Sequence, residues 1–186
     1  SEVPQPEYRF EAGDILVLVR SRGELASLIV ARLFAAGVPV AGVDRLHLHE
    51  PLAVQDLLAA VKFAVQPNDD LSLACLLVSP LIGWDQDRLR KLAFGRKGSL
   101  WRELRQRAAE FHSAHDVLAE LLRIADYTTP SQFLQTILSG PMEGRRKLYS
   151  RLGMAARDPI DELMNSALEF ERTEIASLDR FLAWFS

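Results

Sequence analysis

The sequence has little that could cross-link it or hold a metal. Its 186 residues include one cysteine, Cys75, so an internal disulfide or a zinc site built on several thiolates is excluded. Because Cys75 lies within the apolar run Leu71–Val78, we expect a buried core thiol. The metal-ligand residue types that gather in one segment are His47, His49, Glu50 and Asp56. They lack a third ligand at a fixed spacing, and we expect no metal site.

The sequence also lacks long apolar runs. None approaches the roughly 20 residues that a helix needs to cross a bilayer, and no signal-peptide pattern opens the chain. We therefore expect a soluble, cytoplasmic protein that makes no use of a membrane.

Phosphate-binding and nucleophile motifs are missing as well. The chain contains neither the Gly-x-x-x-x-Gly-Lys-Ser/Thr loop nor Gly-x-Gly-x-x-Gly, and it has no nucleophile elbow. A free-standing nucleotide-binding enzyme is therefore disfavoured, and we expect no complete catalytic site.

In contrast to these missing motifs, the distribution of charge along the chain is informative. The net charge is −3, which gives no general attraction for nucleic acid. Between positions 88 and 107 this balance reverses, because eight bases stand against the single acid Glu103: Arg88, Arg90, Lys91, Arg96, Lys97, Arg102, Arg105 and Arg107. Trp84 and Trp101 flank the run and could stack or wedge. This pattern favours contacts to a nucleic-acid backbone, and the alternative is a solvated helical face balanced by acidic neighbours.

The first 43 residues predict a small β-α-β unit. Ile15–Val19 is continuous and β-rich, which predicts a strand covered on both faces. A helical pattern follows over Gly23–Ala36 and ends at Gly37, and Val38–Val43 suits a second, parallel strand. Arg20 ends the first strand, where a guanidinium can bind phosphate oxygens; it could instead cap the sheet or pair with an acid.

The rest of the chain is helical in pattern, so the predicted fold class is mainly α, a multi-helical domain after the small β-α-β piece. Helices are expected over Ala53–Val65, Asp70–Val78, Gln86–Ala93, Leu100–Glu110, Ala114–Tyr127, Pro130–Leu138, Arg145–Leu152, Pro159–Glu171 and Ser177–Phe185. Pro, Gly, Asn and Asp punctuate most of the breaks between them. In the loop before position 85, the apolar-Gly turn Leu81-Ile82-Gly83 could offer backbone N–H groups to phosphate, or could simply join two core helices.

Several segments, taken in order, resemble a known family. Asp14–Arg22, the helix after it and Gly37–Val40 are similar to motif IV and its sequel in UvrD/Rep-type superfamily 1 helicases. Later segments resemble more closely the AddA helicase-nuclease branch of that group; they are Leu48–Leu58, Pro67–Leu71, Ser79–Gly83, Asp158–Leu163 and Ser177–Trp184.

This resemblance implies a piece of a longer protein. Residues 1–43 would be the first portion of the RecA-like subdomain 2A, and residues 44–186 the helical subdomain 2B. Arg20 matches the arginine that contacts the γ-phosphate of ATP. Subdomain 2B touches duplex DNA, partly through a Gly-Ile-Gly-type loop that reads Leu81-Ile82-Gly83 here, so its first glycine is absent.

The resemblance also implies a function for the parent. It would be an ATP-dependent DNA helicase and exonuclease of double-strand break repair and recombination, using ATP and Mg²⁺ with an AddB-type companion subunit on double-stranded DNA. The Walker motifs, motifs V and VI and any nuclease motif lie outside this sequence, so we expect the chain itself to be inactive and to hold no cofactor. The expected DNA contacts are Leu81, Ile82, Gly83, Arg88, Arg90, Lys91, Arg96, Lys97 and Arg102. The alternative function is a helical protein–protein interaction module that binds the companion subunit.

Overall fold

The computed structural model describes residues 14–18, 29, 32–33, 36–38 and 51–185. The chain divides into two units, Ser1–His47 and Leu48–Ser186. The helices of the second unit are α3 (Leu52–Val65), α4 (Asp70–Val78), α5 (Gln86–Ala93), α6 (Leu100–Gln106), α7 (His112–Ala125), α8 (Pro130–Ser139), α9 (Gly144–Leu152), the short 3-10 helix η2 (Met154–Ala156), α10 (Arg157–Thr173) and α11 (Leu178–Phe185). The prediction of a mainly helical protein is confirmed.

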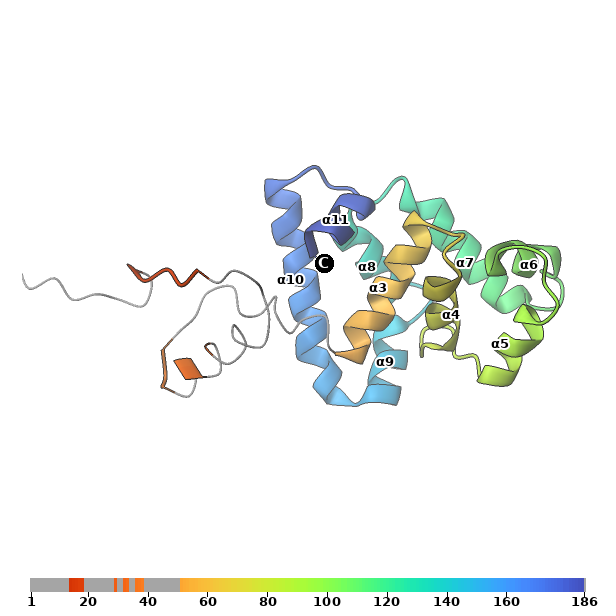
Figure 1. The fold of residues 1–186 in the computed structure, drawn as a ribbon, viewed down its shortest axis with the longest axis horizontal. Helices are drawn as coiled ribbons and strands as arrows, with labels where there is room; N and C mark the ends of the chain where they lie inside the picture. Colours follow the sequence, from red (N-terminus) through yellow and green to blue (C-terminus); the bar gives the residue numbers. More distant parts are fainter. Residues whose placement is uncertain (1–13, 19–28, 30–31, 34–35, 39–50, 186) are drawn as a thin grey trace, which may run out of the picture. The chain divides into compact units, whose positions relative to one another are not determined.

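Helix α3 is the centre of this unit. Eight of its 14 residues are buried, among them Val54, Leu57, Val61 and Phe63. It packs against α4, α7, α8, α9, α10 and α11. Figure 1 shows α10 on one side of α3 and the α5–α6 pair on the other. A helix that is apolar on most of its circumference is stable in water only when other helices cover it.

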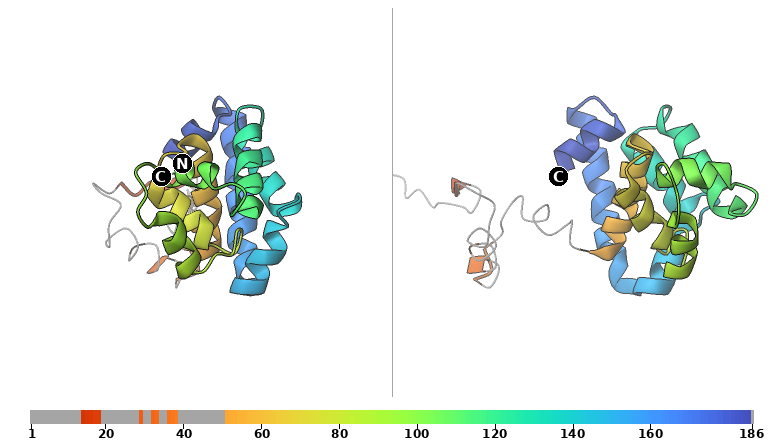
Figure 2. Two further views of the ribbon diagram at one scale, coloured as in Figure 1. Left: turned by 90° about the vertical axis from the view of Figure 1, so that its right-hand side faces the viewer. Right: turned by 45° about the vertical axis from the view of Figure 1, so that its right-hand side comes forward.

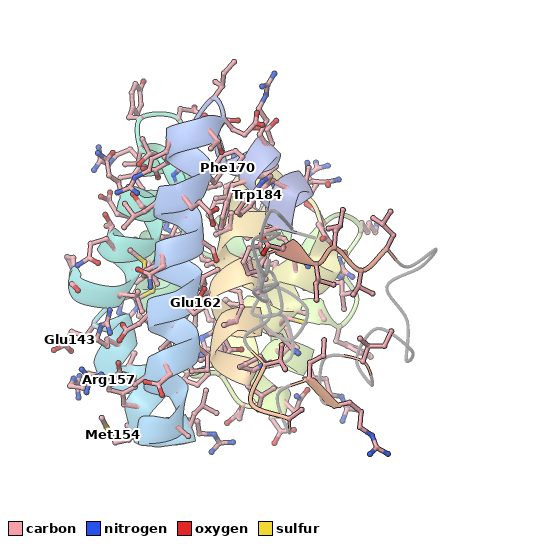
Figure 3. The ribbon with its side chains drawn as sticks, turned by 90° about the vertical axis from the view of Figure 1, so that its left-hand side faces the viewer. Glu143, Met154, Arg157, Glu162, Phe170 and Trp184 are labelled. Carbon is pink, nitrogen blue, oxygen red and sulfur yellow. The ribbon has the colours of Figure 1, made fainter. Side chains whose placement is uncertain are left out.

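The two sides of α3 are built differently. On one side α8 and η2 pack against α10, α9 packs against α8 and η2, and α10 packs against α11. Figure 3 shows Phe170 of α10 close to Trp184 of α11, and their ring centroids are 5.4 Å apart. On the other side α4, α5 and α6 pack on one another (Figure 2). The α5–α6 pair therefore lies at the periphery of the unit.

Side-chain caps set the starts of four predicted helices, α4, α5, α6 and α8. Asp69 accepts from the Leu71 N–H at 3.0 Å, Asp85 from the Arg88 N–H at 2.7 Å, and Ser99 from the Arg102 N–H at 3.3 Å. Thr129 and Gln132 form a capping box at the start of α8. Each cap satisfies an N–H group that has no partner within its own helix, which explains why local punctuation locates these boundaries.

One predicted helix is too long. Helix α6 ends at Gln106, whereas the sequence pattern predicted a helix to Glu110. The chain leaves the helix at Arg107 and brings Phe111 into the core, where its ring lies 5.1 Å from that of Trp84. Burial of this aromatic ring overrides the helical propensity of the Ala108–Glu110 segment.

The predicted β-α-β piece is not shown by the structure. Within residues 15–18 there is no strand, and the side chains are 54–84% exposed. A buried strand forms only with neighbours to pair with, and a two-stranded sheet alone is marginal. Val19 and residues 39–43 lie outside the described residues. The predicted helix end at Gly37 is found, because Gly37 has φ of 71° and the Val38 N–H donates to the Leu33 carbonyl at 2.9 Å.

Gly144 offers a test of this packing. A Cβ at this position would lie 2.6 Å from the Ile137 carbonyl oxygen and 3.1 Å from Leu81 Cδ2. We expect Gly144→Ala to lower the free energy of unfolding by about 1–3 kcal/mol, measured by urea denaturation. Gly98→Ala is the control, because its Cβ would meet only the movable Arg102 side chain, at 3.1 Å. Equal losses in the two variants would contradict the assigned close approach of α9 to Leu81.

Candidate nucleic-acid interface

The basic run lies on α5, on α6 and on the turn between them, and the structure divides its eight cations into two groups. The first group is neutralised. Lys91 pairs with Glu110 at 2.7 Å, and Arg107 pairs with Glu110 at 2.8 Å and with Glu103 at 3.6 Å. The hydrogen bonds from Lys91 and Arg107 hold the pKa of the Glu110 carboxyl below its usual value. These cations stabilise the packing of α5 on α6, as the alternative interpretation of the run expected.

Arg96 also belongs to the neutralised group. Its guanidinium pairs with Asp70 and donates to the Gly98 carbonyl at 2.9 Å. The other Asp70 oxygen accepts from the Leu100 N–H at 2.7 Å, and Ser99 Oγ donates to the Asn68 side-chain oxygen at 2.9 Å. These contacts fasten the α5–α6 turn to the start of α4.

The second group carries uncompensated charge. Its members are Arg88, Arg90, Lys97, Arg102 and Arg105, all of them exposed. None has a carboxylate partner among residues 51–185. We call these five side chains the basic surface. Arg88 lies over the Trp84 ring, 5.0 Å from its centroid, and Arg105 lies 6.0 Å from that of Trp101, so both guanidinium groups rest on aromatic faces.

The two tryptophans that flank the run are core residues. Trp84 is 6% exposed and Trp101 is 7% exposed. Trp84 packs on Phe111, and Trp101 packs on Phe63 with ring centroids 5.4 Å apart. The interpretation that they stack on bases is therefore wrong in this fold. The exposed aromatic residue of the run is Phe94, which the sequence pattern did not single out.

The loop Leu81–Gly83 is held by hydrogen bonds to the protein itself. Leu81 is fully buried and its N–H donates to Ser79 Oγ at 3.3 Å, while the Ile82 and Gly83 N–H groups donate to the Ser79 carbonyl at 3.3 and 2.7 Å. Lys147 donates to the Leu81 carbonyl at 2.7 Å. These N–H groups are already satisfied, so the interpretation that they bind phosphate is disfavoured.

A carboxylate occupies the start of α5. Asp85 caps this helix through the Arg88 N–H, at the place where a bound phosphate would have to lie. Any contact from this segment to DNA would use the Ile82 side chain, which is partly buried, or the exposed Gly83 backbone, where φ is 79°.

Other predicted residues lie elsewhere. Arg20, His47, His49 and Glu50 are outside the described residues. In the described part of the chain no group of three or more His, Cys, Asp or Glu side chains could hold a metal ion. The helices of that part are all too short or too polar to span a bilayer.

Cys75 is exposed, which corrects the prediction of a buried thiol. Helix α4 is apolar on most sides, so its sequence does not show which side is buried. The structure buries Leu73, Leu76 and Leu77. Cys75 lines an open hollow of about 520 Å³ between α3, α4 and α9. Asp56 lies in the same hollow, and burial raises the pKa of its carboxyl to about 6.

The geometry defines a helical domain with an uncompensated basic surface on a peripheral helix pair.

No family model matches the chain. It is similar to an ATP-dependent helicase/nuclease subunit from Oceanobacillus iheyensis, 27% identical over 114 residues, which is 61% of this chain and 9% of that protein. It is also similar to the protein of the same name from Acetivibrio thermocellus, 29% identical over 105 residues, which is 56% of this chain and 8% of that protein. The chain thus spans less than a tenth of these relatives. The matches support the resemblance to helicase-nucleases and assign no subdomain.

Asp56 gives a prediction for pH dependence. Its folded pKa of about 6 exceeds the ordinary 3.8, so the folded chain holds this proton more tightly than the unfolded chain does. Ionisation therefore costs stability as the pH rises from about 4 to about 6. We expect Asp56→Asn to raise the melting temperature at neutral pH more than at pH ~4. Asp126→Asn, at an exposed position, is the control; a gain for Asp56→Asn that does not vary with pH would contradict the assignment.

Proposed function

We propose that this chain is a non-catalytic part of an ATP-dependent DNA helicase-nuclease of the AddA type, and that its helical unit contacts duplex DNA. The observation that carries the proposal is the basic surface, five exposed cations without carboxylate partners among residues 51–185, in a chain whose net charge is −3. The similarity to two helicase/nuclease proteins supports the same class of partner.

The physical basis is counterion release. Duplex DNA carries one charge per roughly 1.7 Å of its axis, and each phosphate that a cation neutralises releases condensed counterions. A cation already paired with a carboxylate contributes little, because binding DNA would first break that pair. Lys91, Arg96 and Arg107 therefore have structural roles, and Arg90, Lys97 and Arg102 are the strongest candidates for phosphate contacts.

The roles of the parent protein belong to the proposal too. It would hydrolyse ATP with Mg²⁺, work with an AddB-type companion subunit, and act in the cytoplasm in double-strand break repair and recombination. In this proposal residues 1–43 begin subdomain 2A, with Arg20 as an ATP-contacting arginine, and residues 44–186 form subdomain 2B. The Leu81–Gly83 loop adds a contact through Ile82 and Gly83.

The second candidate function is a protein interaction module for the companion subunit. The observation that favours it is the hollow between α3, α4 and α9, whose rim includes Leu52 and Leu71, 60% and 74% exposed. This surface is separate from the basic surface, so substitutions on α5 and α6 distinguish the two functions.

A charge-reversal pair of variants tests the DNA proposal. The test variant is Arg90→Glu, Lys97→Glu, Arg102→Glu, and the matched control is Arg151→Glu, Arg172→Glu, Arg180→Glu on α9, α10 and α11, where three charges are likewise reversed at exposed positions. Duplex affinity is measured by fluorescence anisotropy across a salt series. We expect the test variant alone to lose most of its affinity, with the log–log salt slope shallower by about 0.9 for each phosphate contact removed.

Circular dichroism verifies that both variants fold. An equal loss in the two would show that net charge, rather than the basic surface, governs binding. Unchanged duplex binding by the test variant would overturn the basic surface as the DNA contact, and absence of duplex binding by the unaltered chain would favour the interaction module.

A further inference from the structure

Phe94 is an exposed aromatic residue in an unusual setting. It is 81% exposed, whereas Phe63, Phe111, Phe133, Phe170 and Phe181 are fully buried or nearly so. It is the residue that ends α5, and its N–H donates to the Arg90 carbonyl at 2.9 Å. Gly95 follows with φ of 74°, which turns the chain away from the helix axis.

The exposure of Phe94 is fixed by its neighbours. Two residues later Arg96 is held by Asp70 and by the Gly98 carbonyl, and Asp70 also accepts from the Leu100 N–H. The turn is thus anchored at both ends, by the last turn of α5 and by the start of α4. The phenyl ring is presented outward on a supported turn, and reaching the core would require breaking these bonds.

The charges around Phe94 suit a nucleic acid. Arg90 lies one helical turn before it and Lys97 three residues after it, and both belong to the basic surface. No acid occurs between Arg88 and Arg102. Among residues 51–185, Tyr127 is the other aromatic residue with comparable exposure, 85%, and it follows an aspartate instead. A lone exposed ring needs no explanation, but a ring framed by free cations offers the two groups that a nucleotide recognises, one for its phosphate and one for its base.

We propose that Phe94 stacks on an exposed nucleobase, so that the basic surface prefers DNA in which a duplex meets a single strand over continuous duplex. This proposal rests on the proposed DNA binding and deepens it. In continuous duplex both faces of each base are covered by neighbouring pairs, and inserting a ring costs the stacking that it disrupts. At a junction or a duplex end one face is open, and an aromatic side chain covers it without that cost.

The test compares two DNAs with the 186-residue chain. One is a dumbbell duplex closed at both ends by non-nucleotide linkers that stack on the terminal pairs, so it has no unpaired base, and the other is the same duplex with a single-stranded overhang that carries 2-aminopurine at the first unpaired position. We expect Phe94→Ala to weaken binding to the overhang DNA on the order of tenfold and to leave dumbbell binding nearly unchanged. Phe94→Trp should retain the preference and the change in 2-aminopurine fluorescence, whereas Phe94→Leu should lose both.

Tyr127→Ala is the matched control, because it removes an equally exposed ring far along the sequence, between α7 and α8. The high exposure of both rings means that neither substitution should alter the circular dichroism spectrum. Equal dumbbell and overhang affinities in the wild-type chain, or an overhang affinity that Phe94→Ala leaves intact, would overturn the stacking role alone. Absence of binding to either DNA would overturn the proposed function together with it.

Discussion

The burial of α3 is the constraint on which the rest of the helical unit depends. Eight of its 14 residues are buried, and α4, α7, α8, α9, α10 and α11 surround it. Such a helix must be covered on all sides, and the neighbouring helices cover it with their apolar faces. The α5–α6 pair packs on α4 and reaches α3 through the contact of Trp101 with Phe63, so it covers less of α3 and presents more of its surface to solvent. The site of the basic surface follows from how α3 is covered.

The ion pairs that the nearby acids form determine which cations of α5 and α6 are free. Asp70 and Glu110, with Glu103 beside them, neutralise Arg96, Lys91 and Arg107. Each of these ion pairs also fastens one segment to another, so the acids are committed to the fold. The remaining five cations form no ion pair with an acid among residues 51–185. A charge run that looks uniform in the sequence thus separates into a structural part and a part available for binding.

Local chemistry explains what the sequence could predict. The starts of α4, α5, α6 and α8 were predictable because Asp69, Asp85, Ser99 and Thr129 cap the helices that follow them. Properties that depend on contacts between residues far apart in the sequence were not predictable. Cys75 is exposed because α4 buries Leu73, Leu76 and Leu77 instead. Trp84 is buried against Phe111, and α6 ends early because the chain turns there to bring Phe111 into the core. The division of the basic run depends on Asp70, which lies 26 residues before Arg96.

The same contacts hold the Leu81–Gly83 loop and the start of α5, which carries part of the basic surface. Trp84 is buried and its N–H donates to the Leu77 carbonyl at 2.9 Å, which ties the end of the loop to α4 immediately before α5 begins. Lys147 ties the Leu81 carbonyl to α9, and burial lowers the pKa of this lysine. Arg88 then rests on the Trp84 ring. Since loop, ring and helix share these anchors, a ligand that touches Gly83 and the α5 cations meets groups already held in place, and the entropy lost on binding is correspondingly small.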